Sequence, residues 1–207
     1  MEQTTCICIG RQLASGGRAV GKILAERMGM QYFDRELLDL AAAESGLSRD
    51  IFERGDEKRG FFASAARAAA SFLTQGEVYS QPVSAARLFE IQAAAIRKAA
   101  AERDCVFIGR AADYVLRDHP RSLSVFISAD DADRIRVLMQ GKDLDANEAR
   151  HVMEKVDSNR AAFYNFYSGK RWGQASSYDM CLNSSKLGYE GCADMIISCL
   201  NMRNSDE

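Results

Sequence analysis

Short apolar segments alternate with longer segments of helical periodicity along this chain of 207 residues. The apolar segments have the length and composition of strands that are buried on both faces of a parallel sheet. Strands that alternate with helices form βα units, in which the helices cover a mainly parallel sheet. The sequence therefore predicts an α/β fold with strands at residues 5–9, 31–33, 105–108, 123–127 and 179–182.

The third and fourth strands are nearly continuous apolar runs, and we expect them to be central in the sheet. Residues 35–103 contain no convincing strand, but they include an alanine-rich helical run at residues 63–70 and a helical stretch that opens at Pro82. This part is predicted to be a helical insertion. Later in the chain, Asp145 and Glu148 have the spacing of a capping box, which predicts a long helix to about Tyr167.

Composition restricts the class of protein. A chain of this length is expected to form a single domain, and its 27 Lys and Arg residues are spread along the sequence at a net charge of −2, which argues against nucleic-acid binding. The first residues lack a signal-peptide pattern, and no segment is apolar for about 18 residues, so we expect no membrane association. The six cysteines lack zinc or redox spacing and mostly lie in apolar runs, which favours buried free thiols in the cytoplasm.

The loop that follows the first strand contains Ser15, Gly16 and Gly17 and leads into a helix. Backbone N–H groups that converge at a helix N-terminus can bind a phosphate, and glycines let the chain turn and approach the anion closely. An ordinary strand-to-helix turn would use the same glycine pair. The match to the P-loop pattern is incomplete, because Gly17 stands in the lysine position and Arg18 in the hydroxyl position.

Further candidate residues lie at strand ends and on the long helix. Arg110 follows the third strand, where ligands of open parallel sheets collect, although a surface salt bridge would also explain it. Asp157 and Arg160 are three residues apart on the long helix and form either part of a mobile lid or an exposed ion pair. Asp34 could contact a nucleoside or act as a helix N-cap.

Other polar and aromatic residues carry less information. The aromatic residues of the long helix and the segment after it are expected to pack together rather than stack on a base. His119 and His151 have no partner at catalytic or metal-ligand spacing, and no residue is predicted to be a metal ligand.

In their order along the chain, several motifs resemble the cytidylate kinase-like family, a branch of the P-loop nucleoside monophosphate kinases. The resemblance extends from Ile7 to about Leu200. The motifs are Arg11-Gln12 with Ser15-Gly16-Gly17-Arg18, Tyr32-Phe33-Asp34, Gly109-Arg110-Ala111-Ala112-Asp113-Tyr114, Val125-Phe126-Ile127-Ser128-Ala129 with Arg134, Asp157-Ser158-Asn159-Arg160-Ala161, Trp172-Gly173 and Tyr178-Asp179-Met180-Cys181-Leu182-Asn183-Ser184-Ser185.

The resemblance implies a three-layer P-loop fold with a five-stranded parallel sheet. It also implies a core at about residues 4–34, 104–136 and 176–203, a helical monophosphate-binding insertion at about 35–103 and a lid at about 137–175. By position, the donor nucleotide would be bound by Arg11, Ala14, Ser15, Gly16, Gly17, Arg18, Asn183, Ser184 and Ser185, the acceptor by Asp34, Arg110 and Asp113, and catalysis would involve Arg18, Arg134, Asp157 and Arg160.

The implied reaction is transfer of the γ-phosphoryl group of ATP, with Mg²⁺ on the donor oxygens, to a nucleoside monophosphate such as CMP or dCMP or to a similar small acceptor. Arg18, Arg11 or Lys22 could supply the charge that the absent lysine would carry. One alternative is a nucleotide or phosphate sensor of the same fold that has lost transfer activity. Another is an interaction protein whose alanine-rich helices form an oligomer contact, and self-association is compatible with every reading.

Overall fold

The computed structural model describes residues 4–34, 36–46, 85–141 and 144–205. The chain divides into two compact units, one formed by Met1–Asp34 with Ala100–Glu207 and the other by Arg35–Ala99. The predicted alanine-rich run at residues 63–70 lies outside the described residues, and so does Pro82. From Ala85 onward, the stretch that was predicted to open at Pro82 is helical. In the second unit the structure describes α2 (Glu36–Ser45) and most of α5 (Ala85–Glu102), and α5 ends in the first unit.

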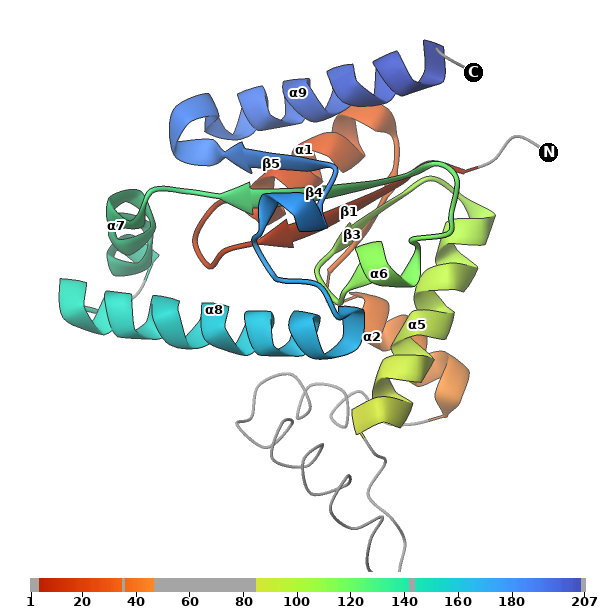
Figure 1. Cartoon of the computed structure of the whole chain (residues 1–207), viewed down its shortest axis with the longest axis horizontal. Coiled ribbons are helices and arrows are strands. Elements are labelled where there is room, and N and C mark those ends of the chain that lie inside the picture. Colours follow the sequence, from red (N-terminus) through yellow and green to blue (C-terminus); the bar gives the residue numbers. More distant parts are fainter. Residues whose placement is uncertain (1–3, 35, 47–84, 142–143, 206–207) are drawn as a thin grey trace, which may run out of the picture. The chain divides into compact units, whose positions relative to one another are not determined.

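The first unit contains a five-stranded sheet in which all neighbouring strands are parallel, in the order β2-β3-β1-β4-β5 (Figure 1). This confirms the predicted α/β fold and its strands. Their bounds are β1 Cys6–Arg11, β2 Gln31–Phe33, β3 Cys105–Ile108, β4 Ser122–Ser128 and β5 Met180–Asn183.

The middle strand is β1, and β3 and β4 lie on its two sides. The expectation that the third and fourth strands are central was therefore wrong for the middle position, although both lie inside the sheet. Ile9 of β1 pairs with Ile108 of β3 and with Val125 of β4, and residues 6–9 of β1 are almost completely buried. An apolar pattern indicates burial, but it does not decide which of several buried strands takes the middle position.

Helices cover both faces of this sheet. Helices α1 (Gly17–Met28) and α9 (Ser184–Ser205) lie together on one face, and α6 (Ala112–Val115) and α8 (Ala146–Ser168) lie on the other (Figure 1). Helix α7 (Asp131–Gly141) follows the end of β4, and a 3-10 turn at Ala175–Ser177 precedes β5. The main core lies between the sheet and the α1/α9 pair and includes Ile7, Ile9, Val20, Leu24, Val106, Val125, Ile127 and Ile196.

Local sequence signals fix several helix ends. The Asp145 side chain accepts hydrogen bonds from the backbone of Asn147 and Glu148, and Glu148 bonds back to the Asp145 N–H, so the predicted capping box is present. Helix α1 begins after Gly16 and ends before Gly29, both with left-handed φ angles. The first unit thus presents the strand, loop and helix that the sequence predicted around residues 10–17.

Candidate functional site

Two loops follow the neighbouring strands β1 and β3 at the carboxyl edge of the sheet. Among the described residues, the non-glycine residues with positive φ are Ala14 at 59°, Arg110 at 61° and Ala111 at 50°, and all of them lie in these loops. Such conformations cost about 1 kcal/mol or more each and are concentrated at functional sites. The strain therefore marks this edge of the sheet as the place to look for a site.

The loop after β1 delivers the N-terminus of α1 to this edge. Gly16 is the N-cap residue, with φ 76°, and the first intrahelical hydrogen bond runs from Val20 N to the Gly16 oxygen at 3.0 Å. The N–H groups between Gly17, where the helix begins, and Val20 therefore have no intrahelical acceptor. They lie at the positive end of the helix, which is the geometry that binds phosphate groups.

Buried hydroxyl groups hold the shape of this loop. The Ser15 side chain is buried, and its Oγ lies 3.0 Å from the Gln12 carbonyl oxygen and 2.9 Å from that of Ile127. The Ser184 hydroxyl in turn donates to the Ser15 carbonyl oxygen at 2.7 Å. Both serines, which were predicted to contact the donor nucleotide, use their hydroxyls on main-chain atoms.

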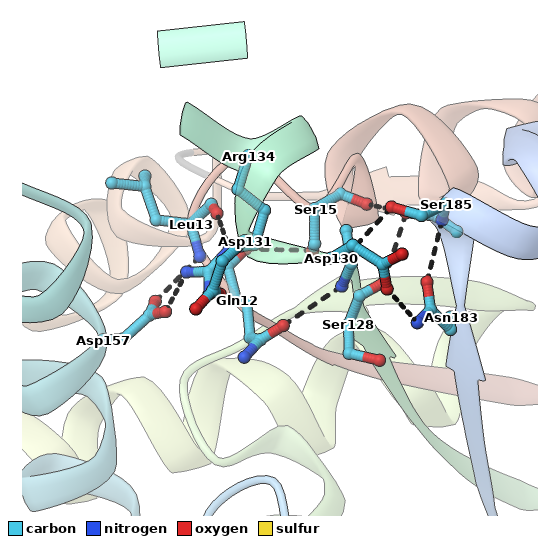
Figure 2. Close-up of polar contacts among 12 residues, drawn as sticks. Gln12, Leu13, Ser15, Ser128, Asp130, Asp131, Arg134, Asp157, Asn183 and Ser185 are labelled. Atoms are coloured by element: carbon cyan, nitrogen blue, oxygen red, sulfur yellow. Dashed lines mark hydrogen bonds and ion pairs between the residues drawn. The ribbon is translucent and has the colours of Figure 1, made fainter. Parts of the chain in front are cut away.

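A buried ion pair attaches helices α7 and α8 to the same loop (Figure 2). Arg134 is 2% exposed; its Nε donates to the Leu13 carbonyl oxygen at 2.8 Å, and its guanidinium also bonds Asp131 and Asp157. Asp157 additionally accepts a hydrogen bond from the Leu13 N–H at 2.7 Å. Arg134 and Asp157, which the resemblance assigned to catalysis, thus bind the carbonyl oxygen and the N–H of Leu13 in the loop.

The predicted base-contacting residues Asn183 and Ser185 lie in a second polar network (Figure 2). The Asn183 side-chain amide donates to Asp130 at 2.9 Å and its oxygen accepts from Ser185 N at 2.9 Å. The Ser185 hydroxyl accepts from Asp130 N at 2.9 Å, and Lys186 pairs with Asp130 at 2.6 Å. This network joins the end of β5 to the segment between β4 and α7.

Three arginines, Arg11, Arg18 and Arg160, have polar contacts beside the loop. Arg160 of α8 donates to the Arg11 carbonyl oxygen at 3.1 Å and lies 3.7 Å from Asp157. The Asp157 and Arg160 side chains are 14% and 23% exposed, so this pair is not the solvent-exposed ion pair considered as an alternative from sequence. Arg18 pairs with Asp34 at 2.7 Å, and Arg11 lies 4.0 Å from the same carboxylate.

The charges of these groups act on Arg11. The pKa of Arg11 is lowered to about 9, mainly by burial and also by the positive charges of Arg160, Arg110 and Arg18, while Asp34 opposes the shift. At neutral pH the side chain still carries its charge. Several positive charges therefore act on Arg11 against the one carboxylate of Asp34, an arrangement that an anionic ligand would stabilise.

Asp113, on the first turn of α6, lies in a largely buried polar cluster. Its carboxylate accepts a hydrogen bond from the Tyr164 hydroxyl of α8 at 2.7 Å. Burial raises the pKa of Asp113, while the hydrogen bond from Tyr164 and the charge of Lys170 act in the opposite direction. Burial, together with the Asp113 charge, also raises the pKa of Tyr164. The predicted acceptor residue Asp113 is thus connected to the long helix.

Several residues of this region had no predicted role. The Gln12 side chain accepts a hydrogen bond from Ala129 N at 3.1 Å. Tyr178 stacks against Tyr164 at a centroid distance of 5.7 Å. Tyr189 lies against Gly16, where a Cβ atom would overlap its ring. These contacts join segments far apart in the sequence, so no local pattern could have indicated them.

The predicted aromatic packing is confirmed in part, since Phe166 on the long helix is 63% exposed. The rings of Phe126 and Trp172 are 5.0 Å apart, and those of Phe163 and Tyr167 are 4.9 Å apart. A group of three or more His, Cys, Asp or Glu side chains able to hold a metal ion was not found within the described ranges.

Comparison with known proteins identifies the family. The model of the cytidylate kinase-like family matches residues 6–186, which is most of the chain. The chain belongs to the cytidylate kinase-like family. The resemblance that the sequence motifs predicted is therefore confirmed.

Solved structures similar to this family member support its fold. An uncharacterized protein from Eubacterium ventriosum is 27% identical, with a TM-score of 0.70, 96% of this chain and 99% of that chain being covered. Shikimate kinase from Bacteroides thetaiotaomicron is 15% identical with a TM-score of 0.54, covering 95% and 98% of the two chains. Shikimate kinase from Acinetobacter baumannii in complex with shikimate is 11% identical with a TM-score of 0.51, covering 97% and 94%. The first unit's sheet and helices thus have the kinase-like P-loop fold.

No curated protein matches the sequence. Among the helices that the structure describes, none combines the length and the apolar character needed to cross a bilayer.

We predict that Arg134→Ala lowers the free energy of unfolding by about 3–5 kcal/mol, because it leaves the Asp157 carboxylate in a poorly solvated place without its main partner. Urea denaturation measures this loss. Arg136→Ala on the same helix is the control, since Arg136 pairs with Asp133 at the exposed surface, where ion pairs contribute little to stability. Equal effects of the two changes would contradict the structural role of Arg134.

We also predict a pH effect from Asp113. Because its pKa is raised in the folded protein, the folded state binds more protons than the unfolded state above about pH 4, and the Asp113 contribution to stability falls as pH rises through the raised pKa. Asp113→Asn should remove this contribution. The unfolding free energy of the variant minus that of the wild type should therefore become more positive between pH 4 and 7. A difference that is constant or decreases would contradict the prediction.

Proposed function

We propose that the protein transfers the γ-phosphoryl group of ATP to a nucleoside monophosphate of the CMP or dCMP type, or to a similar small anionic acceptor. The observation that carries the proposal is that the charges of Arg18, Arg110 and Arg160 act on the Arg11 guanidinium, and that Arg160 bonds the Arg11 backbone while Arg18 and Arg11 both face Asp34. Phosphoryl transfer depends mainly on positioning and on neutralising charge, which is what such a set supplies. Membership in a kinase-like family supports the same assignment.

The donor phosphates are proposed to bind at residues 14–18. The loop conformation supports this, because Gly16 turns the chain so that the first N–H groups of α1 face outward. Ser15 is assigned to holding the loop, since its hydroxyl contacts two carbonyl oxygens. Asn183, Ser184 and Ser185 are proposed to form a fixed wall beside the donor base, because their side chains are oriented by Asp130 and by main-chain groups.

The acceptor is proposed to bind between the end of β2 and the loop after β3. Asp34, Arg110 and Asp113 lie at these two places. Arg110 would bind the acceptor phosphate bidentately, since guanidinium matches phosphate oxygens in geometry. Asp113, oriented by Tyr164, would accept a hydrogen bond from a hydroxyl group of the acceptor.

Magnesium fits this site only through the nucleotide. Ser15 uses its hydroxyl on main-chain oxygens, Arg18 stands where the P-loop pattern has a hydroxyl, and the described residues contain no acidic cluster for a metal. When bound to ATP, Mg²⁺ would neutralise charge on the phosphate oxygens. The role of the protein itself is to hold the phosphates at the α1 N-terminus and to place Arg11, Arg18 and Arg160 around them.

Arg160, Arg134 and Asp157 are proposed to connect the lid to the donor site. Arg134 and Asp157 hold the loop at Leu13, and Arg160 reaches the Arg11 carbonyl oxygen from the same helix as Asp157. We infer that Arg160 acts on the transferring group directly, whereas Arg134 and Asp157 act by positioning the loop. Movement of α8 would then change the charge around the phosphates.

A second function is a nucleotide or phosphate sensor without transfer activity. The observation that favours it is that the loop has neither the lysine nor the hydroxyl residue of the P-loop pattern, because Gly17 and Arg18 stand there. The two functions use the same site and differ in turnover alone.

A coupled assay with ATP and Mg²⁺ tests the proposal. The acceptors offered are CMP, dCMP, UMP and AMP, and also shikimate, because two solved structures of similar fold are shikimate kinases. We expect transfer to at least one nucleoside monophosphate well above the rate without acceptor. Arg110→Ala should reduce kcat/KM by roughly 100-fold, since one charged donor at a transferring group contributes on this scale. Arg117→Ala is the control, because Arg117 is exposed and pairs with Asp118.

The other outcomes separate the alternatives. A rise of the melting temperature with ATP or CMP but no transfer to any acceptor would favour the sensor. No effect of millimolar nucleotide on the melting temperature would contradict both functions and would favour an interaction protein.

A further inference from the structure

Two glycines lie against the Arg11 side chain along its length. A Cβ atom on Gly17 would lie 2.5 Å from Cβ and 3.0 Å from Cγ of Arg11. A Cβ atom on Gly109 would overlap Nη1 of the same arginine. A side chain at either position would therefore displace the Arg11 side chain. This side chain extends from the end of β1 across Gly17 to Gly109, which follows β3.

The positions of Arg11 and Gly17 correspond to two fixed positions of the P-loop pattern, G-x-x-x-x-G-K-[ST]. With Gly16 as the second glycine, the first glycine position is held by Arg11 and the lysine position by Gly17. Compared with the pattern, a long cationic residue therefore stands at the glycine position and a glycine at the lysine position. Because the aliphatic part of the Arg11 side chain lies on Gly17, a side chain at position 17 would occupy the same space.

The guanidinium of Arg11 lies where a phosphate charge would be stabilised. The positive charges of Arg160, Arg110 and Arg18 act on it, and the opposing carboxylate of Asp34 lies 4.0 Å from it. Its Nε is buried, and no acceptor for it is present among the described residues. The other candidate charges are placed differently: the Arg18 side chain is 51% exposed and pairs with Asp34, and Lys22 is exposed on α1.

We propose that Arg11 supplies the charge on the donor phosphates that a P-loop lysine would supply, and that Gly17 is a glycine because the Arg11 stem fills the space above it. The proposal depends on the proposed function in one respect, the binding of ATP phosphates at residues 14–18. Arg11 reaches the phosphates from the strand side of the loop, whereas a lysine at position 17 would reach them from the first turn of α1.

Three variants test this exchange. Arg11→Met keeps a stem over Gly17 and removes the charge. Gly17→Lys adds the pattern's lysine while the Arg11 stem is still present. The double variant Arg11→Gly with Gly17→Lys restores both positions of the P-loop pattern. Arg27→Ala is the control, because Arg27 lies in the last turn of α1 and pairs with Glu190 and Asp194.

Calorimetric titration with Mg²⁺–ATP and with inorganic tripolyphosphate measures binding, and thermal unfolding measures stability. We expect Arg11→Met to weaken both ligands by roughly 10- to 100-fold, as the loss of a charged hydrogen-bonding group does, with little change of the melting temperature. Gly17→Lys should lower the melting temperature and weaken binding. The double variant should bind at least tenfold more tightly than either Arg11→Met or Gly17→Lys, and Arg27→Ala should bind like the wild type.

Four results would overturn the proposal: unchanged affinity of Arg11→Met, an unchanged melting temperature of Gly17→Lys, a double variant no better than the single variants, or a wild type that binds neither ligand. Phosphoryl transfer is measured separately on the same proteins. If the wild type binds both ligands but transfers nothing, the kinase assignment fails, while the binding comparison still decides the role of Arg11.

Discussion

The position of β1 in the middle of the parallel sheet is the constraint on which the rest of the first unit depends. Because β1 pairs with β3 and β4, its end lies between the ends of both neighbours. Arg11 is its last residue, and the chain then turns through residues 12–16 into α1. One strand end therefore brings together the N-terminus of a helix, the arginine-bearing loop after β3 and the segment after β4, and α8 closes against them through Asp157 and Arg160.

The sequence predicted the fold well because its signals were local. The clearest strands, at residues 105–108 and 123–127, were nearly continuous apolar runs, and the long helix began at a capping box formed by Asp145 and Glu148. The order of the strands was not predictable in this way. Pairing joins residues such as Ile9 and Ile108 that are far apart in the chain, and burial alone does not distinguish β1 from β3 or β4.

The candidate site was predictable in its residue types but not in its contacts. Gly16, Gly17 and Arg110 stood out because glycines and arginines after strands have a physical reason to be there. The sequence paired Asp157 with Arg160 by helical spacing, yet Asp157 also bonds Arg134 and the backbone of Leu13. Such contacts depend on how α7 and α8 approach the loop. For the same reason, the sequence left three candidates for the missing lysine's charge, and the packing of Arg11 on Gly17 is the observation from which we propose Arg11.

The central claim is that anionic phosphates bind where the first turn of α1 meets the arginines of β1, the β3 loop and α8. A crystal structure with a non-hydrolysable ATP analogue and a nucleoside monophosphate tests it most directly. The account predicts phosphate oxygens within hydrogen-bond distance of the Gly16 and Gly17 backbone N–H groups and of the Arg11 guanidinium. An analogue bound elsewhere, with Arg11 directed away from its phosphates, would contradict it.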